Sequence, residues 1–235
     1  MPHKDTITIC ACSSRQTMNR EEIIKLVFAL KNAGQTVTVI PDLCKLAISD
    51  AEKMATVAST TVVACYPRAV RSIFDSLGLK PKCMFDIRNH SSEQILNEMD
   101  ISQPAFPSEY FLPALDNVSL QENGQEAWNP VIDKERCTDC GKCHDFCLFG
   151  VYSVIDGKIK VTQPQNCKNN CPACARVCPS KAIIFPKYEK SPINGGLCDE
   201  EQLSEADAKN LYNTALKQKL EERRAKVSLL RKNQP

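Results

Sequence analysis

The chain has 235 residues, of which 43% are hydrophobic and 25% are charged, and its formal net charge at pH 7 is +2. This composition is typical of a globular protein with room for two modest domains, and it excludes a disordered or fibrous chain. The near-neutral charge gives no reason to expect a nucleic acid or a membrane surface as a partner. The longest apolar stretches are far too short to span a bilayer.

Residues 5–100 alternate strand-like and helix-like patterns. The expected strands are Thr6–Cys12, Thr36–Ile40, Thr60–Tyr66 and Cys83–Ile87. The expected helices are Asn19–Ala33, a helix capped by Ser49 that runs to Ala58, Val70–Leu77 and Ser92–Met99. Such alternation predicts a parallel sheet covered on both faces by helices with right-handed crossovers. We therefore expect residues 1–100 to form a small α/β domain.

Residues 101–130 have a different character. Four prolines, at positions 104, 107, 113 and 130, interrupt a stretch without any sustained hydrophobic period. We interpret this stretch as an extended linker over the surface of one or both domains, pinned down by apolar residues such as Phe106 and Tyr110.

Eight of the fourteen cysteines lie in two runs, in a part of the chain (residues 131–190) that we expect to form a second domain. The first run is Cys137-x2-Cys140-x2-Cys143-x3-Cys147, and the second is Cys167-x3-Cys171-x2-Cys174-x3-Cys178 followed by Pro179. A tight loop with a thiolate at about every third residue can wrap three corners of an iron-sulfur cube, and the fourth thiolate then points toward a second cube. An internal repeat supports this organisation, because each run is followed by a short turn and a strand-like segment.

From Val131 to Pro186 the chain resembles the bacterial-type two-cluster ferredoxins. The resemblance implies an α+β fold with two [4Fe-4S] clusters and crossed ligation. It assigns one cluster to Cys137, Cys140, Cys143 and Cys178, and the other to Cys147, Cys167, Cys171 and Cys174. The chain departs from the family at Leu148, where a proline usually stands, and by one extra residue between Cys167 and Cys171. A pair of four-cysteine zinc sites is the alternative, which the interleaved runs and the Cys178-Pro179 ending argue against.

Three further cysteines follow expected strands. Cys10 and Cys12 end the first strand and Cys65 ends the third, so all three belong to one edge of a parallel sheet, where open α/β sheets bind ligands. The segment Ala64-Cys65-Tyr66-Pro67-Arg68, together with Cys10-Ala-Cys12, resembles the N-terminal region of the large flavoprotein subunit of heterodisulfide reductases. That resemblance implies a third metal site, an additional [4Fe-4S] cluster at Cys10, Cys12 and Cys65. Alternatively, these cysteines are small hydrophobic residues of the core.

The loop Ser13–Thr17 is rich in hydroxyl groups and precedes a helix, so it could bind the phosphate of a nucleotide or flavin. However, it contains no glycine, and the chain lacks a Gly-x-Gly-x-x-Gly motif. An ordinary capped helix start is the preferred interpretation.

Residues 202–232 are expected to form a long charged helix with an apolar stripe. The stripe consists of Tyr212, Leu216, Leu220, Val227 and Leu230. It either packs on the chain's own domain or docks the chain onto a partner subunit.

Together these patterns favour an electron-transfer subunit over a stand-alone enzyme, because a cube with four thiolate ligands has no open iron and no catalytic residue is evident. We expect it to relay electrons between a donor and a larger redox enzyme complex. One alternative is a redox enzyme subunit whose N-terminal domain binds a third cluster or a flavin, and another is a redox-sensing or scaffold iron-sulfur protein. The N-terminus has no signal-peptide pattern, so we expect a cytoplasmic protein, with metal-bound cysteines and an anaerobic setting.

Overall fold

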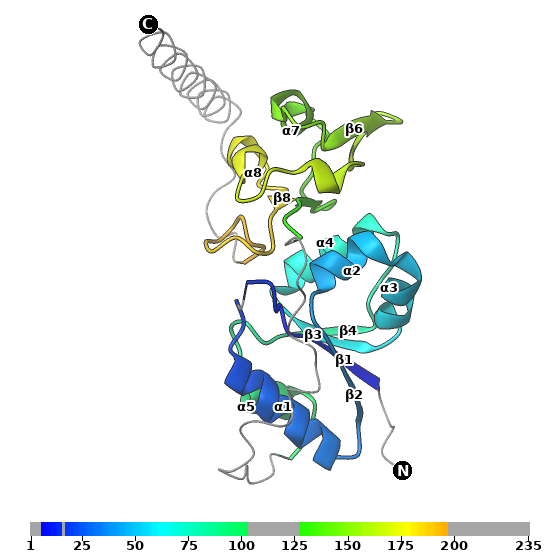
Figure 1. Cartoon of the computed structure of the whole chain (residues 1–235), viewed down its shortest axis with the longest axis vertical. Coiled ribbons are helices and arrows are strands. Elements are labelled where there is room, and N and C mark those ends of the chain that lie inside the picture. The colour runs from blue at the N-terminus through cyan, green and yellow to red at the C-terminus, as the bar shows by residue number, and fades with distance from the viewer. Residues whose placement is uncertain (1–5, 16, 103–126, 197–235) are drawn as a thin grey trace, which may run out of the picture.

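The computed structural model describes residues 6–15, 17–102 and 127–196. Figure 1 shows two parts stacked along the long axis: an α/β part built from residues 6–102 and a cysteine-rich part built from residues 127–196. The predicted helix over residues 202–232, and the apolar anchors expected at Phe106 and Tyr110, lie outside the described residues.

The α/β part contains one parallel sheet of four strands. These are β1 (Thr6–Cys10), β2 (Thr36–Ile40), β3 (Thr61–Ala64) and β4 (Cys83–Asp86), in the order β2-β1-β3-β4. The predicted mixed α/β fold is confirmed, with strands β1, β3 and β4 ending before the expected residues. From β1 the chain moves to β2 on one side, and the later strands lie on the other side. The strand order therefore reverses between β1 and β3, and such a switch point opens a crevice at the carboxyl ends of the strands.

Helices cover both faces of this sheet. They are α1 (Arg20–Asn32), α2 (Leu43–Ser49), α3 (Ala51–Ala58), α4 (Pro67–Ser76) and α5 (Ser92–Glu98). Helices α1 and α5 pack together on one face, and α2, α3 and α4 lie on the other (Figure 1). This arrangement follows from right-handed crossovers that change direction at the switch point.

The connection from β2 to β3 differs from the prediction. Ser49 was expected to cap the helix that ends at Ala58, but it is the last residue of α2, a helix that the periodicity did not predict. The cap of α3 is Asp50, whose side chain accepts a hydrogen bond from the backbone N–H of Lys53 at 2.9 Å. An aspartate accepts this bond as well as a serine does, so the cap is displaced by one residue.

The cysteine-rich part contains two small antiparallel sheets and short helices. Strand β5 (Val131–Ile132) pairs with β8 (Ile183–Ile184), and β6 (Tyr152–Ile155) pairs with β7 (Lys158–Val161). The helices are α7 (Lys142–Phe146), the 3-10 turn η1 (Pro164–Asn166) and α8 (Ala173–Val177). The predicted repeat is present, because α7 is followed by β6 and α8 by β8.

The two parts meet over an apolar junction. Val131 and Ile184 of the β5–β8 sheet belong to the main hydrophobic core of the α/β part. Trp128 is 5% exposed and stacks on Phe185 with ring centroids 5.2 Å apart. The end of the expected surface linker is therefore buried against the cysteine-rich part. Within residues 6–15, 17–102 and 127–196, no helix has the length and apolarity that a membrane crossing requires.

Candidate metal centres

The first group of thiols combines the two cysteine runs. Burial raises the pKa of Cys143 to about 12, and the neighbouring thiolates of Cys178, Cys137 and Cys140 raise it as well. Cys178 follows α8, whereas Cys137 and Cys140 precede α7 and Cys143 lies in its first turn. The loop before α7 is tight, since Asp139 and Gly141 both have left-handed φ angles, of 52° and 78°. The structure thus brings together the four cysteines assigned to one cluster.

The second group joins the last cysteine of the first run to three of the second. Cys147, Cys167, Cys171 and Cys174 line a single small pocket, together with the ring of Tyr152. Burial raises the pKa of Cys167 to about 12, with the Cys171 and Cys147 thiolates as the next causes. These neighbours are the ones that crossed ligation requires.

Two of these sulfur atoms accept hydrogen bonds. The Tyr152 hydroxyl, which is buried, donates to Cys174 Sγ at 3.1 Å, and the backbone N–H of Ala182 donates to Cys178 Sγ at 3.3 Å. Hydrogen bonds to sulfur are among the features that set the reduction potential of an iron-sulfur cluster. The donors therefore suit thiolates that hold a redox centre.

Each of the two groups supplies four thiolates, the ligand set that a [4Fe-4S] cube takes. Among the described residues, no three or more His, Cys, Asp or Glu side chains are grouped closely enough to hold a single metal ion. When bound, such a cluster takes up and gives off one electron at a time.

A third group of thiols lies at the carboxyl edge of the parallel sheet. Cys10, Cys12 and Cys65 are all buried, at 4%, 7% and 8% exposure. Burial raises the pKa of Cys65 to about 12, and the Cys12 thiolate raises it further. The pKa of Cys10 is raised by burial first and then by Cys12, with a smaller effect of Cys65. The three cysteines singled out in the sequence are therefore neighbours at the β1–β3 switch point.

Cys44 is a fourth member of this group that the sequence reasoning missed. Burial raises the pKa of its thiol, and Cys65 and Cys12 are among the charges that raise it further. Cys44 lies in the first turn of α2, two residues beyond the cap Asp42 and shortly after β2. The available signal was its position after a strand, because every loop after a parallel strand begins at the same edge of the sheet. Cys83 begins β4 at the opposite edge and is exposed, and Cys198 lies outside the described residues.

Local structure holds two of these four thiols in place. The backbone N–H of Leu43 donates to Cys10 Sγ at 3.3 Å, and the Thr17 hydroxyl donates to Cys12 Sγ at 3.0 Å. Cys12 has a φ of 46°, a left-handed conformation that costs a residue with a side chain roughly 1–3 kcal/mol. Strain of this kind is concentrated at functional sites, where the surrounding structure enforces it.

Known proteins resemble part of the chain. Ferredoxin-3 of Nostoc sp. is 32% identical over 88 residues, which cover 28% of this chain and 90% of that protein. The chain belongs to the ferredoxins. An uncharacterised ferredoxin of Methanocaldococcus jannaschii is 40% identical over 87 residues, and the match spans 35% of this chain but only 58% of that relative. The pyruvate synthase subunit PorD of Methanothermobacter marburgensis is 37% identical over 68 residues, or 28% of this chain and 78% of the subunit. No family model matches the chain.

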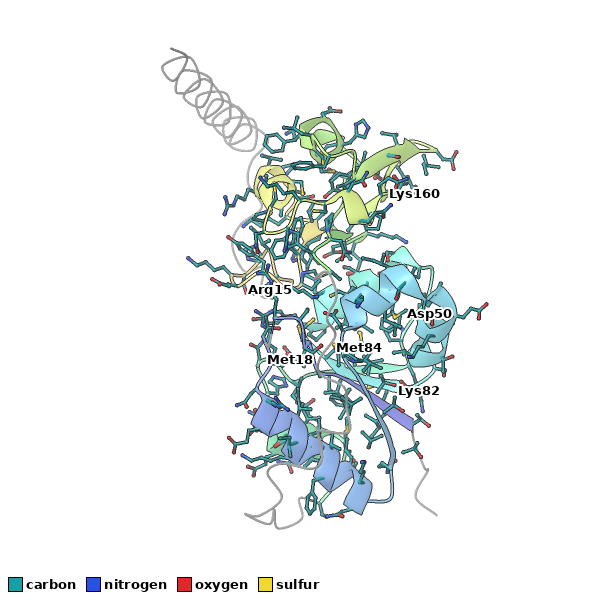
Figure 2. All side chains as sticks on the ribbon, in the orientation of Figure 1. Arg15, Met18, Asp50, Lys82, Met84 and Lys160 are labelled. Atoms are coloured by element: carbon teal, nitrogen blue, oxygen red, sulfur yellow. The ribbon has the colours of Figure 1, made fainter. Side chains whose placement is uncertain are left out.

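In this ferredoxin the cysteine-rich part covers the carboxyl edge of the sheet. Arg68, just after β3, donates to Asp133 Oδ2 at 2.6 Å and also to the carbonyl oxygens of Pro192 and Lys181. Arg15, from the loop after β1, places its guanidinium over the Trp128 ring at 4.6 Å, and Figure 2 shows it at the junction of the two parts. The covered edge is the one that carries the third group of thiols.

The hydroxyl-rich loop after β1 takes part in the same junction. Ser14 Oγ donates to Asp42 Oδ2 at 2.6 Å, and Lys187 Nζ from the cysteine-rich part donates to Ser14 Oγ at 2.6 Å. The Ser14 hydroxyl, considered above as a phosphate ligand, is therefore engaged by groups of the protein itself. Its partners favour the interpretation of this loop as a structural connection.

Proposed function

We propose that this ferredoxin relays single electrons between a donor and a larger redox enzyme complex through two [4Fe-4S] clusters with crossed ligation. The observation that supports it best is the composition of the two thiol groups. Each joins three cysteines of one run to the last cysteine of the other. The similarity to PorD, a named subunit of pyruvate synthase, supports a role within an enzyme complex.

The roles of the residues follow from their surroundings. Eight thiolates hold the irons, and the hydroxyl of Tyr152 and the N–H of Ala182 stabilise negative charge on two of the sulfur atoms. Cys174 is buried while Cys140 is exposed, so one edge of the cysteine-rich part is open to a redox partner. Exposure of this kind also leaves a cluster open to oxygen, which supports an anaerobic setting. The lack of a signal-peptide pattern is the basis for proposing a cytoplasmic location.

We further propose that Cys10, Cys12 and Cys65, joined by Cys44, hold a third [4Fe-4S] cluster. Four buried thiols at the switch point of a parallel sheet support this assignment, as do the hydrogen bonds to Cys10 and Cys12. The likeness of this region to the N-terminal region of the heterodisulfide reductase flavoprotein is part of the same proposal. A flavin at this edge is the competing candidate, but the ferredoxin residues that cover the edge disfavour it.

Iron counting and spectroscopy on anaerobically purified protein test both the two-cluster relay and the third cluster. Two clusters contribute about eight iron atoms per chain and a third raises the count to about twelve. We expect about twelve irons, no flavin absorbance, and one-electron reduction followed by reoxidation with an acceptor protein. Replacing Cys10, Cys12 and Cys65 by alanine should remove about four irons, whereas replacing the exposed Cys83 should remove none. Clusters that cannot be reduced would contradict the relay and favour a scaffold.

We also propose that residues 202–232 dock the chain onto its partner. In this proposal the linker 101–130 joins the α/β domain of residues 1–100 to the ferredoxin domain of residues 131–190, and residues 191–235 form a C-terminal segment. The apolar stripe of the predicted helix is the basis of the docking proposal. A chain truncated after Gly196 should keep its full iron content but no longer co-purify with the complex. Loss of iron on truncation would mean that the segment belongs to the protein's own core.

A further inference from the structure

Lys187 is a buried lysine of the cysteine-rich part (called the ferredoxin part from here on) whose side chain contacts the α/β part. It follows strand β8, and its side chain is 2% exposed. Among the described residues it is the one lysine or arginine classed as buried. Its Nζ donates to Ser14 Oγ at 2.6 Å and forms an ion pair with Asp42, the cap of α2. A lysine ammonium group is rarely buried unless nearby groups compensate its charge.

Two of the four thiols of the sheet edge, Cys12 and Cys44, lie near Lys187. Burial lowers the pKa of Lys187, but the negative charges of Cys44, Asp42 and Cys12 raise it, with a net effect above its usual value. In turn, the lysine lowers the pKa of Cys44 against the raising effect of burial. The contacts of Lys187 agree with this, because Ser14 and Asp42 each lie two residues from one of these thiols. Lys187 is therefore a neighbour of two of the four thiols, although it belongs to the other part of the chain.

A second cation, Arg88, lies near another thiol of the group, Cys65, and is held by the same segment as Lys187. Arg88, after β4, lowers the pKa of Cys65. Its guanidinium donates to the carbonyl oxygen of Pro186 at 3.1 Å and to that of Tyr188 at 3.3 Å. These two carbonyls flank Lys187 in the sequence. The segment 186–188 thus delivers one cation to the thiol group and fixes the other.

A [4Fe-4S] cube with four thiolates carries net negative charge in both of its usual oxidation states. Burying that charge is expensive unless a cation compensates it, and the carboxylate of Asp42 adds to the negative charge here. Net charge near a cluster also helps to set its reduction potential, because a nearby cation stabilises the reduced, more negative form.

We propose that Lys187 is a positioning residue for the four-thiol site and supplies the positive charge that lets Cys10, Cys12, Cys44 and Cys65 hold a cluster. The site is then complete only while the ferredoxin part is docked on the sheet. This inference rests on the third cluster proposed above. It adds that occupancy and potential of that cluster depend on a residue from the opposite part of the chain.

The test compares four variants of the full chain, purified anaerobically: Lys187→Met, Asp42→Asn, the double variant D42N/K187M, and Lys190→Met. Lys190 lies three residues from Lys187 and is exposed, so it is the matched control. The readouts are iron per chain and a redox titration that follows each cluster by its electron paramagnetic resonance signal. We expect K187M to lose about four irons, or to keep them with the one-electron equilibrium of that cluster shifted at least tenfold toward oxidised, about 59 mV. K190M should match the parent protein.

The comparison of D42N with D42N/K187M separates the proposed role of Lys187 from a folding defect. Methionine at position 187 leaves the Asp42 carboxylate buried without its cation, so K187M alone could unfold. Asparagine still caps α2, and D42N/K187M differs from D42N only in the lysine. We expect the double variant to hold less iron than D42N, or to have a lower potential at the third cluster.

Two results would overturn the inference. Equal iron content and equal potential with and without Lys187, in the parent protein or in the D42N background, would make the lysine a packing element only. A parent protein with about eight irons would remove the third cluster, and the Lys187 inference with it. The two-cluster relay would remain, because its cysteines lie in the other two groups.

Discussion

Cys178 is placed among thiols that precede it by more than thirty residues in the sequence. Helix α8 ends one residue before it, and the N–H of Ala182 donates to its sulfur. The same short helix begins next to Cys174, which belongs to the other thiol group. The proposed crossed ligation therefore depends on α8, which places Cys174 in one thiol group and Cys178, the residue after its end, in the other.

Replacing Cys178 by serine tests the crossing. We expect the variant to lose or weaken the cluster of Cys137, Cys140 and Cys143, because one of its four thiolates is removed. The cluster at the other group should keep its spectrum and potential. Cys171→Ser is the matched control and should have the opposite pattern. Electron paramagnetic resonance of the two reduced variants makes the comparison, and damage by Cys178→Ser to the cluster at Cys171 and Cys174 would contradict the assignment.

Within the two cysteine runs, local spacing predicts three thiolates of each cluster, and the resemblance to two-cluster ferredoxins supplies the fourth. This assignment of the eight cysteines stays a prediction. The third group of thiols, at the carboxyl edge of the sheet, could be predicted only in part. Cys10, Cys12 and Cys65 end strands, so their common edge followed from parallel topology. Cys44 was missed because it lies inside an unpredicted helix, α2, and no motif marks it. Lys187 was not predicted as part of this group either. Its Nζ contacts Asp42, which lies 145 residues earlier in the chain, and hydrophobic periodicity carries no information about so distant a contact.

Between β2 and β3 the chain forms two short helices in place of the expected single one. Helix α2 begins at Leu43 after the cap Asp42, and α3 begins at Ala51 after the cap Asp50. Each aspartate accepts a hydrogen bond from a backbone N–H three residues later. The boundary between two helices only a residue apart is thus set by a capping side chain, which a hydrophobic period does not detect.

The cap of α3 gives a test at this scale. Replacing Asp50 by alanine removes the acceptor for the Lys53 N–H and should cost about 1 kcal/mol, which lowers the Tm by roughly 2–4 °C in a protein of this size. Both Ser49 and Asp50 are exposed, and Figure 2 shows Asp50 on the outer side of the α/β part. Ser49→Ala is therefore the matched control and should leave the Tm unchanged. The Tm of each variant is measured by thermal unfolding followed by circular dichroism. A larger fall in Tm for Ser49→Ala than for Asp50→Ala would mean that Ser49 is the cap, as the sequence predicted.

For the whole molecule, the decisive feature is that the ferredoxin part sits on the carboxyl edge of the parallel sheet. Arg68, in the first turn of α4, and Arg88, in the loop after β4, donate to backbone carbonyls of the ferredoxin part. In the opposite direction, Lys187 of the ferredoxin part donates to Ser14 of the α/β part. The existence of both parts was predictable, since each follows from local patterns. Their docking was not, because it depends on buried ionic contacts between residues 65 to 145 positions apart.

Arg68 carries the largest share of the polar contacts at this junction. Its guanidinium reaches the Asp133 carboxylate and two carbonyl oxygens, with side-chain exposures of 16% for Arg68 and 9% for Asp133. Removing one partner of a buried pair leaves an uncompensated charge, so Arg68→Ala should destabilise the junction by about 3 kcal/mol. Asp133 also accepts, through its backbone carbonyl, the N–H of Cys137. We therefore expect hydrogen exchange to become faster at β5 and in the loop that contains Cys137. The change in the exchange rate should be smaller in α1 and α5.

Arg71 provides the control on the same helix. It pairs with Glu135 across the same junction at 3.5 Å, but its side chain is 49% exposed and that of Glu135 is 73% exposed. An exposed ion pair contributes at most about 1 kcal/mol, so Arg71→Ala should change hydrogen exchange little. Hydrogen exchange measured by mass spectrometry on the iron-loaded proteins separates the two cases. Equal protection of β5 in both variants would mean that the apolar contacts of Val131 and Ile184 hold the parts together without help from Arg68.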